Sequence, residues 1–92
     1  MPVAAARHIL VDSKQACDAL KAELDGGADF ADLAAEHSLC PSGAEGGALG
    51  EFGPGQMVPE FDKVVFSAPV NEVQTVKTQF GWHLVEVTKR TK

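Results

Sequence analysis

The chain has 92 residues, of which 45% are hydrophobic and 23% charged, and its formal net charge is −5 at pH 7. This length predicts one small globular domain, residues 1–92, and excludes a cofactor-binding fold with a second substrate domain. The acidic balance argues against nucleic acid as a partner, because a phosphate-backbone binder needs a basic surface. No stretch approaches the roughly 20 apolar residues of a membrane span, so we expect no membrane partner either.

The two cysteines and the N-terminal segment favour a cytoplasmic protein. Residues 1–11 show neither a basic leader nor an apolar run long enough for export. Cys17 and Cys40 are too far apart for a CxxC pair and do not have zinc-knuckle spacing. Two such thiols are typical of free cysteines in a reducing compartment. Cys17 falls in a helical apolar pattern and is interpreted as a small core residue.

The first part of the chain predicts a strand followed by two helices. Residues 4–11 end in a β-branched apolar run, and alternation places His8 on the same face as Ala6 and Leu10. Ser13 is a candidate N-cap for a helix that the Gly26-Gly27 pair would end.

Asp29 is a candidate N-cap for the second, shorter helix. Its expected inward stripe consists of Phe30, Leu33, Ala34 and His37. We assign no chemistry to His37.

The second part of the chain predicts three strands and one helix. A short strand over 48–52 lies inside a glycine-rich segment. Pro59 suits the first turn of a helix that we expect Pro69 to end. Strands follow at 73–77 and 82–89, the last with His83 on one face. The order β-α-α-β-α-β-β predicts an α+β fold, with helices covering a four-stranded antiparallel or mixed sheet.

Four segments together resemble a known family, the parvulin peptidyl-prolyl cis-trans isomerases. They are HILV at 8–11, CPSG at 40–43, GGALGEFGPGQMVPEFDKVVF at 46–66 and TQFGWHLVEV at 78–87. The resemblance runs from about residue 4 to 90 and implies a parvulin/FKBP-like fold, as in small single-domain bacterial members. It implies an enzyme that accelerates X–Pro rotation in unfolded or flexible protein segments and assists folding. Because rotation about the amide needs no covalent step, we expect no cofactor or metal. We expect a monomer, since the sequence has no long apolar run that would be exposed.

The resemblance also assigns a two-part site. The apolar half is a socket for the proline ring, made by Leu49, Met57, Phe61 and Phe80. The polar half is catalytic and consists of His8, Cys40, Thr78 and His83, with Thr78 as the hydroxyl partner of the histidines. From the residues alone, each Met or Phe also fits a core position. A histidine facing inward likewise fits a core residue with satisfied hydrogen bonds.

The chemical role of Cys40 has alternatives. A thiolate activated by histidine would attack the prolyl carbonyl, and the same residues would also suit a Cys-dependent hydrolase. A milder role is a polarisable wall beside the rotating carbonyl, which we favour because the acidic chain offers little to lower a thiol pKa. A zinc site from His8, His83 and Cys40 is disfavoured, since closed structural zinc sites take four ligands.

Two positions depart from the pattern of the resembling family. Ala48 stands in GGALG where the family often has GGDLG, which puts any hydrogen bond of that carboxylate in doubt. Members that require a phosphorylated residue before proline carry a basic cluster after the first strand, whereas Asp12 follows it here. We therefore expect activity that does not depend on phosphorylation. The alternative function is a peptide-binding chaperone module without significant catalysis.

Overall fold

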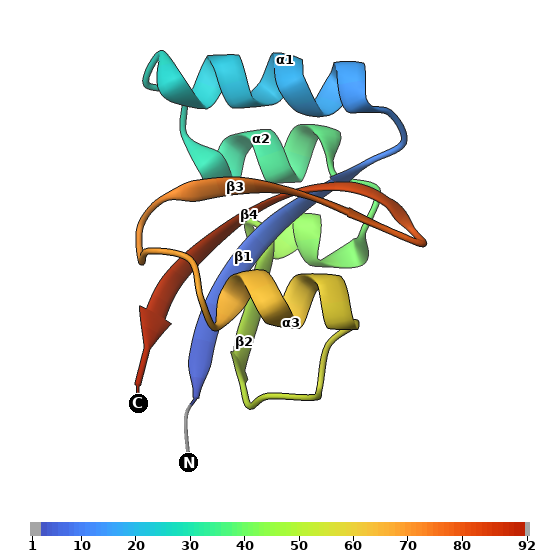
Figure 1. Ribbon diagram of the computed structural model, residues 1–92. Helices are drawn as coiled ribbons and strands as arrows, with labels where there is room; N and C mark the ends of the chain where they lie inside the picture. Colours follow the sequence, from blue (N-terminus) through green and yellow to red (C-terminus); the bar gives the residue numbers. More distant parts are fainter. Residues whose placement is uncertain (1–2, 92) are drawn as a thin grey trace.

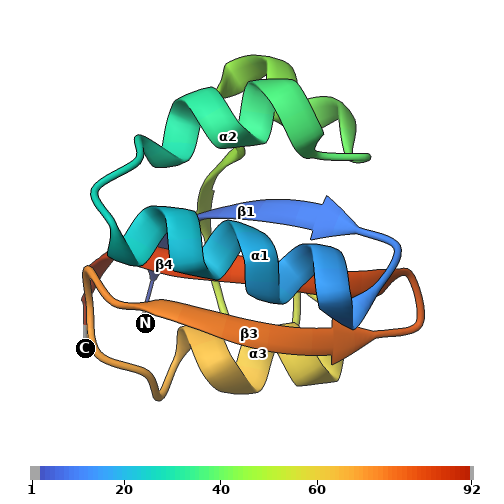
Figure 2. The ribbon, with the colours of Figure 1, turned by 90° about the horizontal axis from the view of Figure 1, so that it is seen from above.

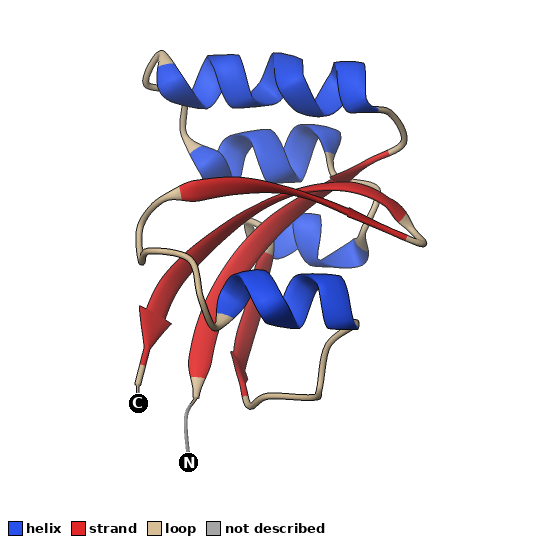
Figure 3. Cartoon of the chain, in the orientation of Figure 1, coloured by secondary structure: helices blue, strands red, loops and turns tan. Residues whose placement is uncertain are grey.

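The computed structural model describes residues 3–91, and these form a sheet with helices on both faces (Figures 1 and 3). The strands are β1 (Ala4–Val11), β2 (Ala48–Phe52), β3 (Val73–Thr78) and β4 (Gly81–Arg90). The helices are α1 (Lys14–Asp25), α2 (Phe30–His37) and α3 (Pro59–Val65), with a 3-10 turn, η1 (Pro41–Glu45). This order confirms the predicted α+β class.

The sheet has the strand order β2-β1-β4-β3, and every neighbouring pair is antiparallel. The central pair therefore joins the first and last strands of the chain. In their register His8 lies opposite Val85, and Leu10 lies opposite His83. The two histidines are thus diagonal neighbours on adjacent strands.

Each face of the sheet has its own apolar core. Helices α1 and α2 lie on one face and α3 on the other, as the two views show (Figures 1 and 2). The α1/α2 core contains Ile9, Val11, Cys17, Leu20, Phe30, Leu33, Ala34 and Leu84. The α3 core contains Ala4, Ala6, Phe52, Phe61, Val65, Val76, Val85 and Val87. The alternation of β1 and β4 sends successive side chains into these two cores.

Both predicted N-caps of the first two helices are present. Ser13 accepts the backbone N–H of Ala16, and Asp29 accepts that of Asp32. The expected inward stripe of α2 is wrong at its last position, because His37 is exposed. His37 is the C-terminal residue of the helix. Its ring therefore lies past the last buried turn, although the helical period is maintained.

The end of α3 also differs from the prediction. The helix ends at Val65 rather than continuing to Pro69. The guanidinium of Arg90 donates to the carbonyl oxygens of Val65 and Ala68 at 3.0 and 2.5 Å. A side chain from β4 therefore satisfies carbonyls at the helix end, and the residue before a proline is in any case biased away from helical geometry.

The glycine-rich segment is bound tightly to β1 beside His8. The backbone N–H of His8 donates to the carbonyl of Gly47 at 3.0 Å. Gly47 has φ +83°, and a Cβ at this position would overlap the carbonyl oxygen of His8. Only glycine fits this close crossing of two backbones. The crossing fixes the η1 turn, with Cys40 and Ser42, next to the histidines.

Candidate active site

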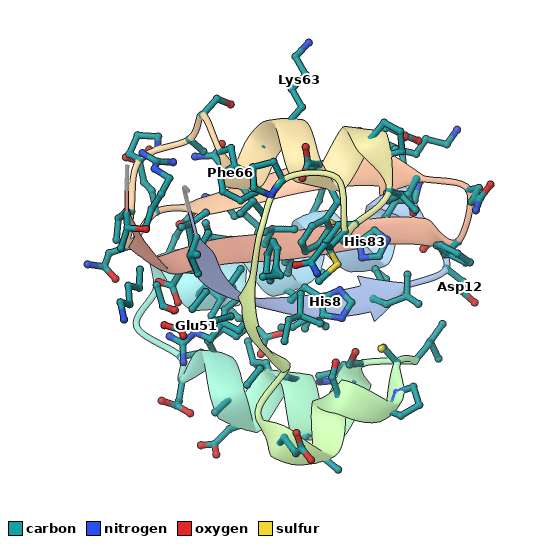
Figure 4. The ribbon with its side chains drawn as sticks, turned by 90° about the horizontal axis from the view of Figure 1, so that it is seen from below. His8, Asp12, Glu51, Lys63, Phe66 and His83 are labelled. Carbon is teal, nitrogen blue, oxygen red and sulfur yellow. The ribbon has the colours of Figure 1, made fainter. Side chains whose placement is uncertain are left out.

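His8 and His83 form a buried, hydrogen-bonded pair on the central strands. Their Nδ1 atoms lie 3.0 Å apart, and their ring planes are 15° from parallel with centroids 5.2 Å apart, so the rings meet edge to edge. The side-chain view shows the two rings next to each other on the face of the sheet that carries α3 (Figure 4). Phe61 of α3 presents its ring roughly at right angles to both imidazoles. The pair is therefore held by the two strands and by one helix.

Thr78 is the hydrogen-bond partner of the His83 ring nitrogen that does not contact His8. The hydroxyl Oγ1 of Thr78 lies 2.8 Å from Nε2 of His83 and is itself buried. The same oxygen accepts the backbone N–H of Phe80 at 3.2 Å. Because that N–H occupies one acceptor position, the hydroxyl proton is free to point at the imidazole.

Ser42 completes the hydrogen-bonded chain at its other end. Its Oγ lies 3.2 Å from Nε2 of His8 and donates to Sγ of Cys40 at 3.4 Å. Because the hydroxyl proton of Ser42 is used on Cys40, its oxygen accepts Nε2–H of His8. Nδ1 of His8 then accepts Nδ1–H of His83, whose Nε2 accepts the proton of Thr78. Every donor has one acceptor while both imidazoles are neutral.

The electrostatics of the pair agree with this arrangement. Burial, with a smaller contribution from the neighbouring His83, lowers the pKa of His8 from 6.5 to about 4. Burial also lowers the pKa of His83. Protonation of His8 at Nδ1 would place two N–H donors face to face, because Nδ1 of His83 already carries a proton. Both rings are therefore neutral at pH 7.

The histidine pair forms one wall of an apolar cavity of about 330 Å³, here called the His8 cavity. Its lining consists of His8, Leu10, Leu39, Cys40, Pro41, Leu49, Met57, Val58, Phe61, Phe80 and His83. Phe61 is 3% exposed and lies at the base of the cavity, whereas Phe80 is 62% exposed. An apolar cavity of this size with few polar groups suits a small hydrophobic side chain or ring.

The structure brings the sequence-predicted site residues to one place. Seven of the eight line the His8 cavity, and the eighth, Thr78, is hydrogen-bonded to His83 behind the cavity wall. Their roles in catalysis and substrate binding remain predictions. Cys17 is fully buried in the other core, where its thiol lies 3.8 Å from the carbonyl of His83.

Sequence reasoning missed Ser42 and part of the cavity wall. Ser42 stands inside the CPSG segment, but its contact with His8 depends on the winding of η1, which no periodic pattern indicates. Leu39 also lines the His8 cavity, but the sequence gives no sign that this leucine is exposed, as it is to 63% in the structure.

The described residues were also compared with what a metal site and a membrane-spanning helix require. Within residues 3–91, no three or more His, Cys, Asp or Glu side chains are grouped so as to hold a metal ion. In the same range, no helix is both long enough and apolar enough to cross a bilayer.

Comparison with known proteins identifies the family. The model of the PPIC-type PPIase domain matches residues 3–91. The foldase protein PrsA of Geobacillus kaustophilus is 45% identical over 93 residues, which covers 99% of this chain and 33% of the relative. A parvulin-like PPIase of Rickettsia bellii is 48% identical over 88 residues, which covers 90% and 31%. The solution structure of NmPin, the parvulin of Nitrosopumilus maritimus, has a TM-score of 0.86 at 32% identity and covers 97% of this chain and 98% of that one.

The chain belongs to the PPIC-type peptidyl-prolyl isomerase domain family, the parvulins. This confirms the resemblance found in the sequence. The chain spans about a third of the length of the two curated relatives described above, and nearly all of the NmPin structure.

Proposed function

We propose that the chain catalyses the cis-trans isomerisation of X–Pro bonds in unfolded or flexible protein segments. The observation that carries this proposal is the His8 cavity, an apolar socket with a neutral histidine pair in its wall. Leu49, Met57, Phe61 and Phe80 would hold the proline ring. His8, His83, Thr78 and Cys40 would surround the rotating amide. Family membership supports the same activity.

The energy required is within reach of such a site. Amide resonance creates a barrier of about 18–20 kcal/mol. A thousandfold acceleration needs about 4 kcal/mol of preferential binding to the twisted state. The planar amide is the more polar of the two states, so moving it from water into an apolar cavity favours the twisted one. No covalent step is required.

The hydrogen-bonded chain fixes the polar wall of the cavity. Each imidazole is held at both nitrogens, since His8 contacts Ser42 and His83 contacts Thr78. A ring with both nitrogens engaged is not free to abstract a proton from the substrate. We therefore assign the pair an electrostatic and positioning role, with preorganised dipoles facing the amide.

Exchange spectroscopy on a panel of Ala-X-Pro-Ala peptides tests this function. Catalysis is expected to broaden the cis and trans proline signals and to give exchange cross-peaks at catalytic amounts of protein. A peptide-binding chaperone module would shift the signals without faster exchange. That outcome would overturn the isomerase proposal. We expect the fastest exchange with an apolar residue before proline.

Independence of phosphorylation is part of the proposal. A dianionic phosphate needs clustered Arg or Lys side chains. The residue that follows β1 is instead the exposed Asp12, placed at the strand tip in Figure 4. Phosphoserine before proline is expected to slow exchange relative to serine, and faster exchange would contradict this.

The oligomeric state, compartment and partners of the domain are also proposed, from its charge and its thiols. We infer one parvulin domain over residues 1–92, monomeric, cytoplasmic and without nucleic-acid or membrane partners. Both cysteines are free thiols, as a reducing compartment allows. The net charge of −5 disfavours nucleic acid. Light scattering and fractionation of cells producing the natural full-length protein test these assignments.

A further inference from the structure

A second cavity adjoins the His8 cavity on the α1/α2 side of the sheet. It has a volume of about 320 Å³ and is here called the α1 cavity. Its lining includes the buried Val11 and Leu20 together with Ala16 and Ala19 of α1, and Asp12 and Glu23 contribute carboxylates. The catalytic arrangement proposed above makes no use of it.

Leu39 connects the two cavities. Among residues 3–91 it is the one residue that lines both of them, and it is 63% exposed. Its backbone N–H donates to the carbonyl of Leu10 at 2.8 Å, which fixes it to the end of β1. A peptide leaving the His8 cavity therefore has one leucine to cross before it reaches the α1 cavity. At about 3.3 Å per extended residue, a few residues beside the proline suffice.

The α1 cavity combines apolar lining residues with carboxylates that have no cationic partner among residues 3–91. Asp12 and Glu23 are exposed, and within residues 3–91 neither has a cationic partner within 4.0 Å. The lysines of α1 are already paired with Asp18 and Asp25. Lysine and arginine side chains, with an aliphatic stem and a cationic end, are complementary to such a cavity.

We propose that the α1 cavity is a substrate subsite for a lysine or arginine side chain a few residues from the isomerised proline. The proposal rests on the proposed isomerase function and names a substrate class for it: X–Pro segments with a nearby basic residue. The aliphatic stem packs along Ala16 and Ala19, while the cation pairs with one of the two carboxylates, because Asp12 and Glu23 are about three helical turns apart.

A peptide scan at pH 8, above the ordinary range of histidine ionisation, tests this, since His37 also lines the cavity. Lysine, norleucine or glutamate is placed at each of three positions on either side of an Ala-Pro pair. At one position or more on one side, lysine is expected to raise kcat/KM about two- to fivefold over norleucine, the range for one exposed ion pair. The preference is expected to weaken at high salt. No preference at any position would overturn the proposal.

Variants separate the cavity from the general field of an acidic protein. The double variant Asp12→Asn with Glu23→Gln is expected to abolish the lysine preference. Asp32→Asn with Glu45→Gln removes the same charge from exposed positions outside both cavities, and this control variant is expected to retain the lysine preference. Ala19→Met fills the cavity without changing its charge and is expected to abolish the lysine preference. Equal losses in both double variants would indicate long-range attraction and contradict a subsite.

Backbone amide shifts distinguish failure of this inference from failure of the isomerase function. Titration with the lysine peptide is expected to shift the amides of residues 16–23 and 39 more than the norleucine peptide does. Isomerisation of both peptides without these shifts would refute the subsite and leave the isomerase function standing. These shifts without isomerisation would refute the isomerase function and leave binding at the α1 cavity standing.

Discussion

Nδ1 of His8 and Nδ1 of His83 lie 3.0 Å apart although the two residues are not paired across the sheet. His8 lies opposite Val85, and His83 lies opposite Leu10, so the imidazoles meet along a diagonal. Diagonal neighbours on one face are within reach of ring side chains. The ladder between β1 and β4 therefore sets the geometry of the site.

The pH dependence of activity follows from the neutral state of this pair. Because the pKa of His8 is lowered to about 4 and that of His83 is also lowered, neither ring gains a proton near neutrality. We expect kcat/KM, measured by exchange spectroscopy, to stay constant from about pH 8 down to about pH 6 and to fall only in more acidic solution. A loss of activity with a midpoint near 6.5 would mean that an ordinary histidine acts as a base.

The same pKa shift predicts that acid destabilises the fold. A histidine in the unfolded chain has a pKa near 6.5, whereas that of folded His8 is about 4, so the unfolded state binds more protons between these values. The free energy of unfolding is expected to fall by about 3 kcal/mol from this group between pH 7 and pH 4. Urea denaturation at several pH values measures it. In His8→Gln this part of the slope should vanish, and an unchanged slope would contradict the assignment.

Thr78 is expected to act as a positioning residue for His83. Thr78→Val keeps the shape but leaves Nε2 of His83 without its buried partner, at a cost of about 1–3 kcal/mol of stability. Thr78→Ser retains the hydroxyl and is expected to retain activity. Imidazole nitrogen chemical shifts provide the specific readout, since the valine variant alone should alter the tautomers. Unaltered tautomers with lower kcat would contradict this role.

The two main residues of the apolar socket should separate binding from stability. Phe61 is 3% exposed and belongs to the α3 core, so Phe61→Ala is expected to cost about 3–5 kcal/mol as well as activity. Met57 is half-buried at the cavity wall. Met57→Ala is expected to raise KM several-fold while costing about 1 kcal/mol of stability. Unchanged KM in a folded Met57→Ala protein would remove it from the socket.

Replacement of Cys40 decides between its two chemical roles. As a polarisable wall, Cys40 forms no covalent bond to the substrate and only accepts the Ser42 hydroxyl. Cys40→Ser keeps a hydrogen-bond acceptor at this position. Its activity should therefore stay within about tenfold of the unchanged protein. Cys40→Asp should likewise remain active. Near-complete loss in both variants would support a nucleophilic thiolate. Cys17→Ala, in the opposite core, serves as the control for thiol loss.

Local patterns predicted most of the elements, because short-range physics determines them. The strand over 4–11 and the strand over 48–52 have the predicted bounds, and Ser13 and Asp29 are the predicted caps. The order of the strands was not predictable, since it depends on contacts between distant parts of the chain. The end of α3 depends likewise on Arg90, which comes from β4.

The candidate site shows the same division. The resemblance identified its eight predicted residues, but nothing in the sequence indicates that Ser42 connects His8 with Cys40. That contact requires the η1 turn, and the turn is fixed by the close crossing of Gly47 over His8. Such a crossing involves two backbones far apart in the chain, so it has no periodic signal.

The central position of the first and last strands has a consequence for biosynthesis. The two histidines are 75 positions apart in the chain. At about 5–20 residues per second, a ribosome needs several seconds to add the second histidine after the first. During that interval β1 has no β4 to pair with, and contacts of such long range are slow to form. A nascent parvulin domain therefore has no histidine pair until its final strand has emerged from the ribosome, so this candidate folding catalyst completes its own site last.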